Sequence, residues 1–315
     1  TYDIGALTAT EGANTVTYTA AIENLVGGQN DDTFIYEEGE SQPGNIDGQA
    51  GNDTLDYTAL TTTALDVQLT GNGPVDGFTG TEATTIGGTF TNVDTILAGD
   101  PTTDTLTGVN APGAEWTFST TKTYTFGGET LTFDFFETLV GNGTNNTYYI
   151  EGVVPYNVVG SDNDDTFIFR DGATITGSLD GSAGADTIDL NEYTEAVIAT
   201  LTALGSINGY NGTLETISGT VLIAGGFLNF TNMVGTGAAA ADIFTGRNTT
   251  GADYTLRAAI SDYTDNSTRT FTFSSFEQVT GTVADETFNI ADGETFGGAV
   301  DGATGADTLS YSTLT

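Results

Sequence analysis

Acidic residues that precede threonine form the most regular chemistry-bearing pattern in this chain. One pattern is a hydrophobic residue, Gly, four residues, an acid or Asn, then Thr and an apolar residue. It occurs as LVGGQNDDTFI ending at Ile35, LVGNGTNNTYYI ending at Ile150, VVGSDNDDTFIF ending at Phe169 and VTGTVADETFNI ending at Ile290, with a looser copy, LAGDPTTDTL, ending at Leu106. A second pattern follows as DGQAGNDTL from Asp47, DGSAGADTI from Asp180 and DGATGADTL from Asp301. Carboxylate and turn carbonyl oxygens are the ligands that hard cations prefer, so these turns are candidate cation sites.

The spacing of the two patterns predicts how the acids are positioned. Asp32 to Asp53, Asp165 to Asp186 and Glu286 to Asp307 are each 21 residues apart, and Asn146 to Asp165 is 19. We therefore expect parallel coils of about 20 residues, with equivalent residues stacked at the inter-strand spacing of about 4.8 Å. The apolar residues that follow should form inward stacks in the core, pairing Phe34 with Leu55, Phe167 with Ile188 and Phe288 with Leu309.

Stacking the acids creates like-charge pairs that need compensation. Two carboxylates about 5 Å apart repel by roughly 3 kcal/mol at an effective dielectric constant near 20. Only five basic residues are present, and of these only Arg170 is close in sequence to a stacked pair. A bridging Ca²⁺ is the predicted compensation. The candidate metal ligands are Asp31, Asp32, Asp47, Asn52, Asp53, Asp164, Asp165, Asp180, Asp186, Glu286, Asp301 and Asp307. The alternative is that these side chains form Asx turns or ladders without an ion.

These segments resemble degenerate RTX nonapeptides, GGxGxDxUx, the calcium-binding β-roll repeats of very large secreted bacterial surface, adhesin and matrix proteins. In GGQNDDTFI the match is Gly27, Gly28, Asp32 and Phe34. The later copies match at Gly48, Gly51, Asp53 and Leu55, at Gly181, Gly184, Asp186 and Ile188, and at Gly302, Gly305, Asp307 and Leu309. RTX coils carry tandem nonapeptides, whereas here one copy occurs per longer coil. The resemblance implies structural calcium, secretion and adhesion.

A longer repeat organises the whole chain. FETLVG at 136 to 141 returns as FEQVTG at 276 to 281, IENLVG at 22 to 27 is an earlier copy, and TGVNAPGAEWTF at 107 to 118 matches TGRNTTGADYTL at 245 to 256. One 19-residue copy is inserted without disturbing its neighbours, which is typical of a solenoid. The sequence predicts one continuous all-β, right-handed parallel β-solenoid over 1 to 315, with modules at 22 to 155 and 156 to 275 and partial modules at 1 to 21 and 276 to 315. Tandem antiparallel β-sandwich modules are the alternative.

Composition limits the partners and the chemistry. The 315 residues include 43 acids, no His and no Cys, and the net charge is -38. A polyanion of this kind is a poor partner for nucleic acid or anionic membranes and a natural partner for divalent cations. No apolar run is long enough to span a bilayer. The usual catalytic base and thiol nucleophile are absent, and the regular acids recur as architecture does, so we expect no enzyme activity.

The predicted function is a non-enzymatic structural segment of an extracellular filament, surface fibre or giant adhesin. Its expected partners are copies of itself, divalent cations and cell-surface polysaccharide. Contacts between copies, head to tail or lateral, are expected because the terminal DTLSYSTLT matches the internal DTLDYTALT and both ends fall inside a module. The alternative is a secreted β-helix that binds or cleaves polysaccharide. Tyr156, Trp116 and Tyr254 are its candidate sugar-stacking side chains, although the equivalent repeat positions of Trp116 and Tyr254 favour a core role.

Overall fold

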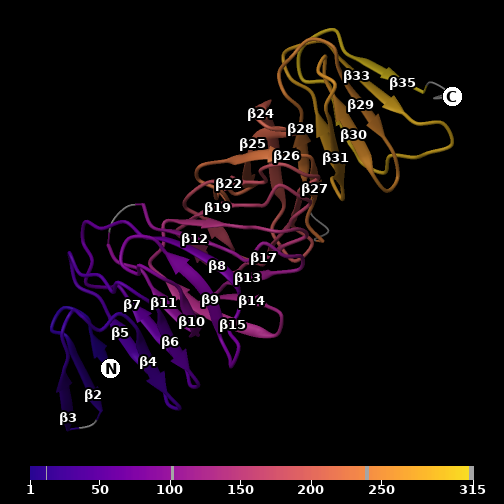
Figure 1. Ribbon diagram of the computed structural model, residues 1–315. Helices are drawn as coiled ribbons and strands as arrows, with labels where there is room; N and C mark the ends of the chain where they lie inside the picture. Colours follow the sequence, from indigo (N-terminus) through magenta and orange to yellow (C-terminus); the bar gives the residue numbers. More distant parts are fainter. Residues whose placement is uncertain (12, 101–102, 238–240, 312–315) are drawn as a thin grey trace. The chain divides into compact units, whose positions relative to one another are not determined.

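The computed structural model describes residues 1–11, 13–100, 103–237 and 241–311. Within these ranges the chain forms strands β1 to β35 and no helix, which confirms the all-β prediction (Figure 1). It follows that these residues hold no helix long and apolar enough to cross a membrane. Residues 197 to 204 form strand β24 (Val197–Leu204). The chain divides into two compact units, Thr1–Asn146 (unit 1) and Thr147–Thr315 (unit 2).

Unit 1 contains two sheets. Sheet A holds β1 (Tyr2–Asp3), β2 (Thr8–Glu11), β3 (Asn14–Thr17), β5 (Thr33–Ile35), β7 (Thr54–Asp56), β11 (Thr95–Leu97), β13 (Glu115–Phe118), β14 (Lys122–Phe126) and β15 (Glu129–Asp134). Strands β5, β7, β11 and β15 pair in parallel, and β15, β14 and β13 form an antiparallel triplet. Strand β1 pairs in parallel with β5 and opens a second antiparallel triplet with β2 and β3.

Sheet B of unit 1 repeats this alternation. It holds β4 (Leu25–Gly28), β6 (Ile46–Gln49), β8 (Asp66–Asn72), β9 (Phe78–Glu82), β10 (Phe90–Val93), β12 (Thr105–Thr107) and β16 (Thr138–Val140). Strands β4, β6 and β10 are parallel, β10, β9 and β8 are antiparallel, and β8, β12 and β16 are again parallel. The two sheets pack face to face, since the ring of Phe78 in sheet B lies 5.5 Å from that of Tyr124 in sheet A.

Unit 2 has the same plan. Its sheet A holds β17 (Thr147–Ile150), β20 (Thr166–Phe169), β23 (Thr187–Asp189), β27 (Asn232–Val234), β29 (Ala252–Leu256), β30 (Ser261–Thr264), β31 (Thr270–Ser274), β33 (Glu286–Ile290) and β35 (Thr308–Ser310). Sheet B holds β19 (Asn157–Val159), β22 (Leu179–Asp180), β24, β25 (Tyr210–Thr216), β26 (Phe227–Phe230), β28 (Ile243–Thr245), β32 (Gln278–Thr280) and β34 (Ala299–Asp301). Parallel runs flank the triplets β29–β30–β31 and β24–β25–β26, and β18 (Val153–Val154) pairs with β21 (Thr174–Ile175). The sheets are therefore mixed but rich in parallel pairs.

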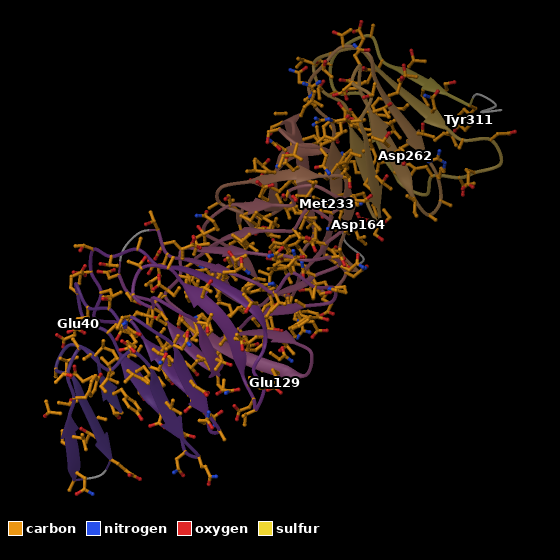
Figure 2. The ribbon with its side chains drawn as sticks, in the orientation of Figure 1. Glu40, Glu129, Asp164, Met233, Asp262 and Tyr311 are labelled. Atoms are coloured by element: carbon orange, nitrogen blue, oxygen red, sulfur yellow. The ribbon has the colours of Figure 1, made fainter. Side chains whose placement is uncertain are left out.

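The predicted register of the apolar stacks is confirmed. Phe34 lies opposite Leu55, Phe167 opposite Ile188 and Phe288 opposite Leu309, each in a parallel pair. All of these side chains are buried except Leu309, which is 55% exposed on strand β35. Figure 2 labels two residues at these extremes, Met233 on β27, which is buried, and Tyr311 just after β35, which is exposed.

The predicted spacing of about 20 residues between paired parallel strands does not hold in the middle of each unit. Leu55 pairs with Ile96, 41 positions later, because the β8–β9 hairpin lies between them, and Ile96 pairs with Phe133 after the β13–β14 hairpin. The same lengthening separates Ile188 from Met233 in unit 2. The antiparallel triplets were not predicted from sequence, because their strands lack the spacing of Gly, four residues, acid and Thr that marks the parallel turns.

Candidate functional site

The two acids of each pair that is 21 residues apart lie beside adjacent strands, as the spacing predicted. Asp53 Oδ1 accepts the backbone N–H of Asp32 at 2.7 Å. The same bond joins Asp186 Oδ1 to the N–H of Asp165 at 2.9 Å and Asp307 Oδ1 to the N–H of Glu286 at 3.0 Å. One carboxylate of each stacked pair therefore accepts a bond from the backbone beside the neighbouring strand, which offsets part of the predicted repulsion.

The residues just before these acids make the reciprocal bond. Asp31 Oδ1 accepts the N–H of Asn52 at 2.9 Å, and Asp164 Oδ1 accepts the N–H of Ala185 at 2.7 Å. Asp285 Oδ1 accepts the N–H of Ala306 at 2.8 Å in the third copy. Asp285 is absent from the predicted set although it precedes Glu286 as Asp31 precedes Asp32. The predicted Asn52 contributes its backbone N–H here.

The acids that open the second pattern form turns. Asp47 Oδ1 accepts the N–H of Gln49, Asp180 Oδ1 that of Ser182, and Asp301 Oδ1 that of Ala303. The three donor residues have φ of 75°, 68° and 58°, in the left-handed region that non-glycine residues adopt rarely. The carboxylate therefore stabilises a strained turn, as the Asx alternative expected.

The glycine five residues before each acid gives the carboxyl group its space. A Cβ built on Gly27 would lie 2.7 Å from Asp32 Oδ2, and one on Gly160 or Gly181 would lie 2.8 Å from Asp165 Oδ2 or Asp186 Oδ2. The later glycine of the second pattern has a different task, since Gly51 and Gly184 have φ of 135° and 127°. The spacing of glycine and acid in the repeat thus follows from close packing and from backbone conformation.

Three of the six stacked acids have a buried oxygen without a hydrogen-bond partner, namely Asp53 Oδ2, Asp186 Oδ2 and Glu286 Oε2. Asp32 Oδ2 accepts the N–H of Gly28, but in the next coil the equivalent N–H, that of Gln49, bonds Asp47 instead. Asp53 Oδ2 is left unpartnered, and Asp186 Oδ2 is left so for the same reason. Burial raises the pKa of Asp53 to about 6 and that of Asp186 to about 8.

A second ladder of carboxylates runs along sheet B and was not predicted. Asp104 Oδ1 accepts the N–H of Leu65 at 2.9 Å, and the N–H of Asp104 bonds Glu137 Oε2 at 2.7 Å. Asp242 and Glu277 repeat this in unit 2, where Asp242 Oδ1 accepts the N–H of Val197. The signal was present in the looser copy that ends at Leu106 and in the repeated hexapeptides FETLVG and FEQVTG.

The predicted calcium ligands do not gather around one point. Among the residues that the structure describes, no group of three or more acidic side chains is arranged to hold a metal ion. One oxygen of Asp31, Asp53, Asp164 and Asp186 already accepts a backbone N–H, and the other oxygen of Asp53 and Asp186 packs against a glycine. This geometry fits the ladder without an ion better than a shared ion site, and calcium binding stays a prediction from sequence.

The candidate sugar-stacking side chains belong to the core. Trp116 and Tyr254 are 0% exposed and Tyr156 is 3% exposed. Trp116 packs edge-on against Tyr124, and Tyr254 against Tyr263. The core role predicted for Trp116 and Tyr254 from their matching repeat positions is therefore confirmed.

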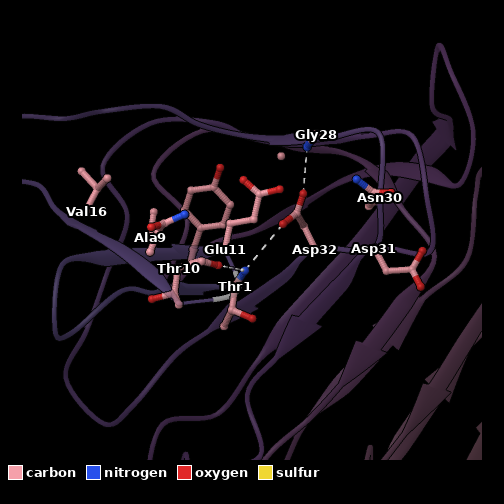
Figure 3. A pocket seen from close by; sticks show the side chains of 12 residues that line it. Thr1, Ala9, Thr10, Glu11, Val16, Gly28, Asn30, Asp31 and Asp32 are labelled. Carbon is pink, nitrogen blue, oxygen red and sulfur yellow. Dashed lines mark hydrogen bonds and ion pairs between the residues drawn. The ribbon is translucent and has the colours of Figure 1, made fainter.

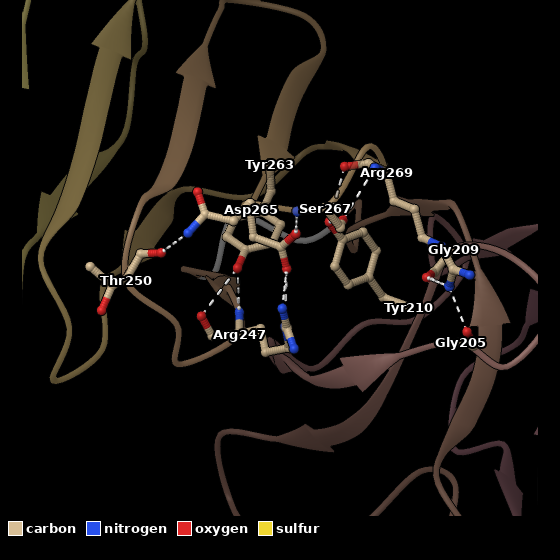
Figure 4. A network of polar contacts seen from close by, with 10 residues as sticks. Gly205, Gly209, Tyr210, Arg247, Thr250, Tyr263, Asp265, Ser267 and Arg269 are labelled. Atoms are coloured by element: carbon tan, nitrogen blue, oxygen red, sulfur yellow. Dashed lines mark hydrogen bonds and ion pairs between the residues drawn. The ribbon is translucent and has the colours of Figure 1, made fainter.

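Two other polar places stand out. A cavity of about 540 Å³ in unit 1 is lined by Thr1, Tyr2, Ala9, Thr10, Glu11, Asn14, Val16, Gly27, Gly28, Asn30, Asp31 and Asp32 (Figure 3). In unit 2, Arg247 Nε and Nη2 both donate to Asp265 Oδ2, at 3.0 and 2.7 Å, and Arg269 donates to the carbonyl oxygens of Gly205 and Gly209 (Figure 4). Both arginines therefore hold loops of unit 2 together through these bonds.

Comparison with known proteins adds no family. A scan against protein-family models finds no match, and a search of curated proteins finds none. The likeness to RTX repeats therefore rests on the glycine, acid and apolar positions of the repeats themselves.

Proposed function

We propose that this chain is a non-enzymatic structural segment of an extracellular filament, surface fibre or giant adhesin, built as a right-handed parallel β-solenoid interrupted by antiparallel triplets. The observation that supports it most is the exchange of carboxylate–amide bonds between coils, which recurs three times at a spacing of 21 residues. An active site requires its catalytic acid at one place, whereas acids that recur in every repeat are expected to stabilise the repeated structure.

Calcium is the part of this proposal that needs a direct test. Its support is the excess of acids over bases, 43 against five, and the repeat resemblance. The carboxylate–amide bonds of the ladder provide part of the charge compensation that the sequence prediction assigned to the ion. Bound calcium would raise the unfolding temperature, with a stabilisation that grows as the logarithm of its concentration relative to its dissociation constant, and a chelator would remove that gain.

The experiment combines particle length and thermal unfolding, each with calcium and with excess chelator. Elongated particles that associate end to end support the rod, and a lower unfolding temperature under chelation supports calcium. Unchanged unfolding would assign the acids to the hydrogen-bonded ladder alone. Short, compact monomers at every concentration would contradict the rod. The alternative of a polysaccharide-binding protein lacks a favouring observation, since its candidate aromatic residues are buried.

A further inference from the structure

The cavity in unit 1 lies at one of three equivalent antiparallel triplets. Each triplet has one row of residues that lie opposite one another on its three strands, and in the second and third triplets this row is buried. The rows are Tyr2, Ala9 and Val16 on β1–β3, then Trp116, Tyr124 and Leu131 on β13–β15, and Tyr254, Tyr263 and Phe271 on β29–β31. Leu131 and Phe271 are 0% exposed, but Val16 is 65% exposed. The first row is therefore uncovered where the other two are covered.

An aromatic side chain from sheet B covers the other two rows. The ring of Phe78 on β9 lies 5.5 Å from that of Tyr124, and the ring of Tyr210 on β25 lies 5.7 Å from that of Tyr263. Both aromatic residues occur between glycines, in GFTG at 77 to 80 and GYNG at 209 to 212. A Cβ on the last glycine of either motif would overlap a phenylalanine ring, Phe90 or Phe227, so the motif reflects close packing.

We propose that the cavity of Figure 3 is a docking site for another module of the same repeat, which inserts the aromatic ring of a Gly-aromatic-x-Gly strand over Ala9 and Val16. The small side chain of Ala9 stands where Tyr124 and Tyr263 stand in the covered rows, which leaves room for the ring. Burying the exposed apolar surface of Val16, together with that of Tyr2 and Ala9 in the same cavity, favours the contact. This inference rests on the proposed function, because it names the contact that would extend the rod.

The free edge of β3 supports the same partner. Strand β15 pairs in parallel with β11, Thr132 opposite Thr95, and β31 pairs in the same way with β27, Thr272 opposite Asn232. Among the described strands β3 pairs only with β2. A docking module therefore brings a strand of the β11 type to Thr17 as well as an aromatic ring to the cavity. Glu11, Asp31 and Asp32 line the cavity, so salt should strengthen docking of an acidic partner.

The test uses the full chain extended at its amino end by a copy of its own residues 65 to 115, which contain β8 to β12. We expect hydrogen exchange at the amides of Val16 and Thr17 to slow by at least about tenfold and the extension to resist proteolysis. The matched control carries Phe78→Ser in the appended copy only, and it should lose most of that protection. Docking of the extension on a second molecule gives the same protection with a doubled mass.

Unchanged exchange at Val16 and Thr17, together with a protease-sensitive extension, would reject the docking site. The rod itself is tested separately, by particle length of the unextended chain. Elongated particles without protection would reject this contact alone, whereas compact particles would reject the proposed function.

Discussion

Units 1 and 2 build the same aromatic centre from different residues. The hydroxyl of Tyr124 accepts the N–H of Val109 at 2.8 Å, and the hydroxyl of Tyr263 accepts the N–H of Arg247 at 3.0 Å, so Val109 and Arg247 are equivalent. Two residues after each tyrosine stand Phe126 in unit 1 and Asp265 in unit 2. Two apolar residues of unit 1 therefore occupy the positions of an ion pair in unit 2.

The fold therefore does not require the ion pair. The Asp265 side chain is 0% exposed, and its carboxylate is compensated by Arg247 and by the N–H of Ser267. Burial alone would raise the pKa of Asp265, but the hydrogen bonds from Ser267 and Arg247 outweigh it and hold the pKa below its usual value. Such a pair is costly to break and of small net value relative to apolar residues.

Replacing Arg247 by Val should have the largest effect of the changes considered. It leaves the buried Asp265 carboxylate without its cation, so we expect a loss of about 3–5 kcal/mol in the free energy of unfolding at pH 7. Urea denaturation measures it. The double change Arg247→Val with Asp265→Phe copies unit 1 and should recover to within about 1 kcal/mol of the parent. A harmless single change would contradict the comparison.

The next largest effect is expected from alanine at the glycines that pack against Asp53 and Asp186, and its size should differ between the two units. A Cβ on Gly48 would overlap the carbonyl oxygen of Asn92 as well as Asp53, whereas the nearest atoms to one on Gly181 all belong to Asp186. A backbone atom moves less easily than a side chain, so Gly48→Ala should cost about 3 kcal/mol and Gly181→Ala about 1–2 kcal/mol. Gly71→Ala, with open space around it, is the control. Equal thermal shifts for the first two would refute the difference.

The stability of the two units should depend on pH differently, because Asp53 and Asp186 have different folded-state pKa values. A carboxyl whose pKa is raised in the folded chain stabilises it fully below the unfolded pKa, near 4, and that stability is lost as pH rises through the folded pKa. The loss should extend to about pH 6 for Asp53 and to about pH 8 for Asp186. In chelator, Asp186→Asn should therefore be more stable than the parent at pH 9, on the order of 1–3 kcal/mol, with little change at pH 5. A parent whose stability is flat between pH 6 and 9 would contradict this.

The smallest effect is expected from exchanging the polar side chains that lie near Asp53 and Asp186. Asn208 Nδ2 donates to the carbonyl oxygen of Gly184, whereas Asp76, at the equivalent place, accepts the N–H of Gly51 and adds its charge to those near Asp53. Asp76→Asn should stabilise unit 1 by about 0.5–1 kcal/mol at pH 7, and Asn208→Asp should destabilise unit 2 by about 1–2 kcal/mol. Calorimetry of both variants tests the opposite signs, and equal signs would refute the account.

Repeat spacing made much of the local structure predictable. The interval of 21 residues predicted the register of Phe34 on Leu55 and of Phe167 on Ile188, because equivalent residues of a repeat lie opposite one another when its strands pair in parallel. The same interval brought Asp32 beside Asp53. It did not reveal the hairpins β8–β9 and β13–β14, whose contacts are antiparallel and leave no periodic trace.

The residue pattern was therefore enough to predict the all-β class, the parallel register at the repeated turns and the placement of acids beside adjacent strands. Tertiary structure alone decided what those acids do. Asp53 and Asp186 keep an unpartnered oxygen because Gln49 and Ser182 turn their N–H groups to Asp47 and Asp180, a choice set by backbone conformation. The protonation of a carboxyl depends on burial and on the direction of nearby donors, and neither is written in residue spacing.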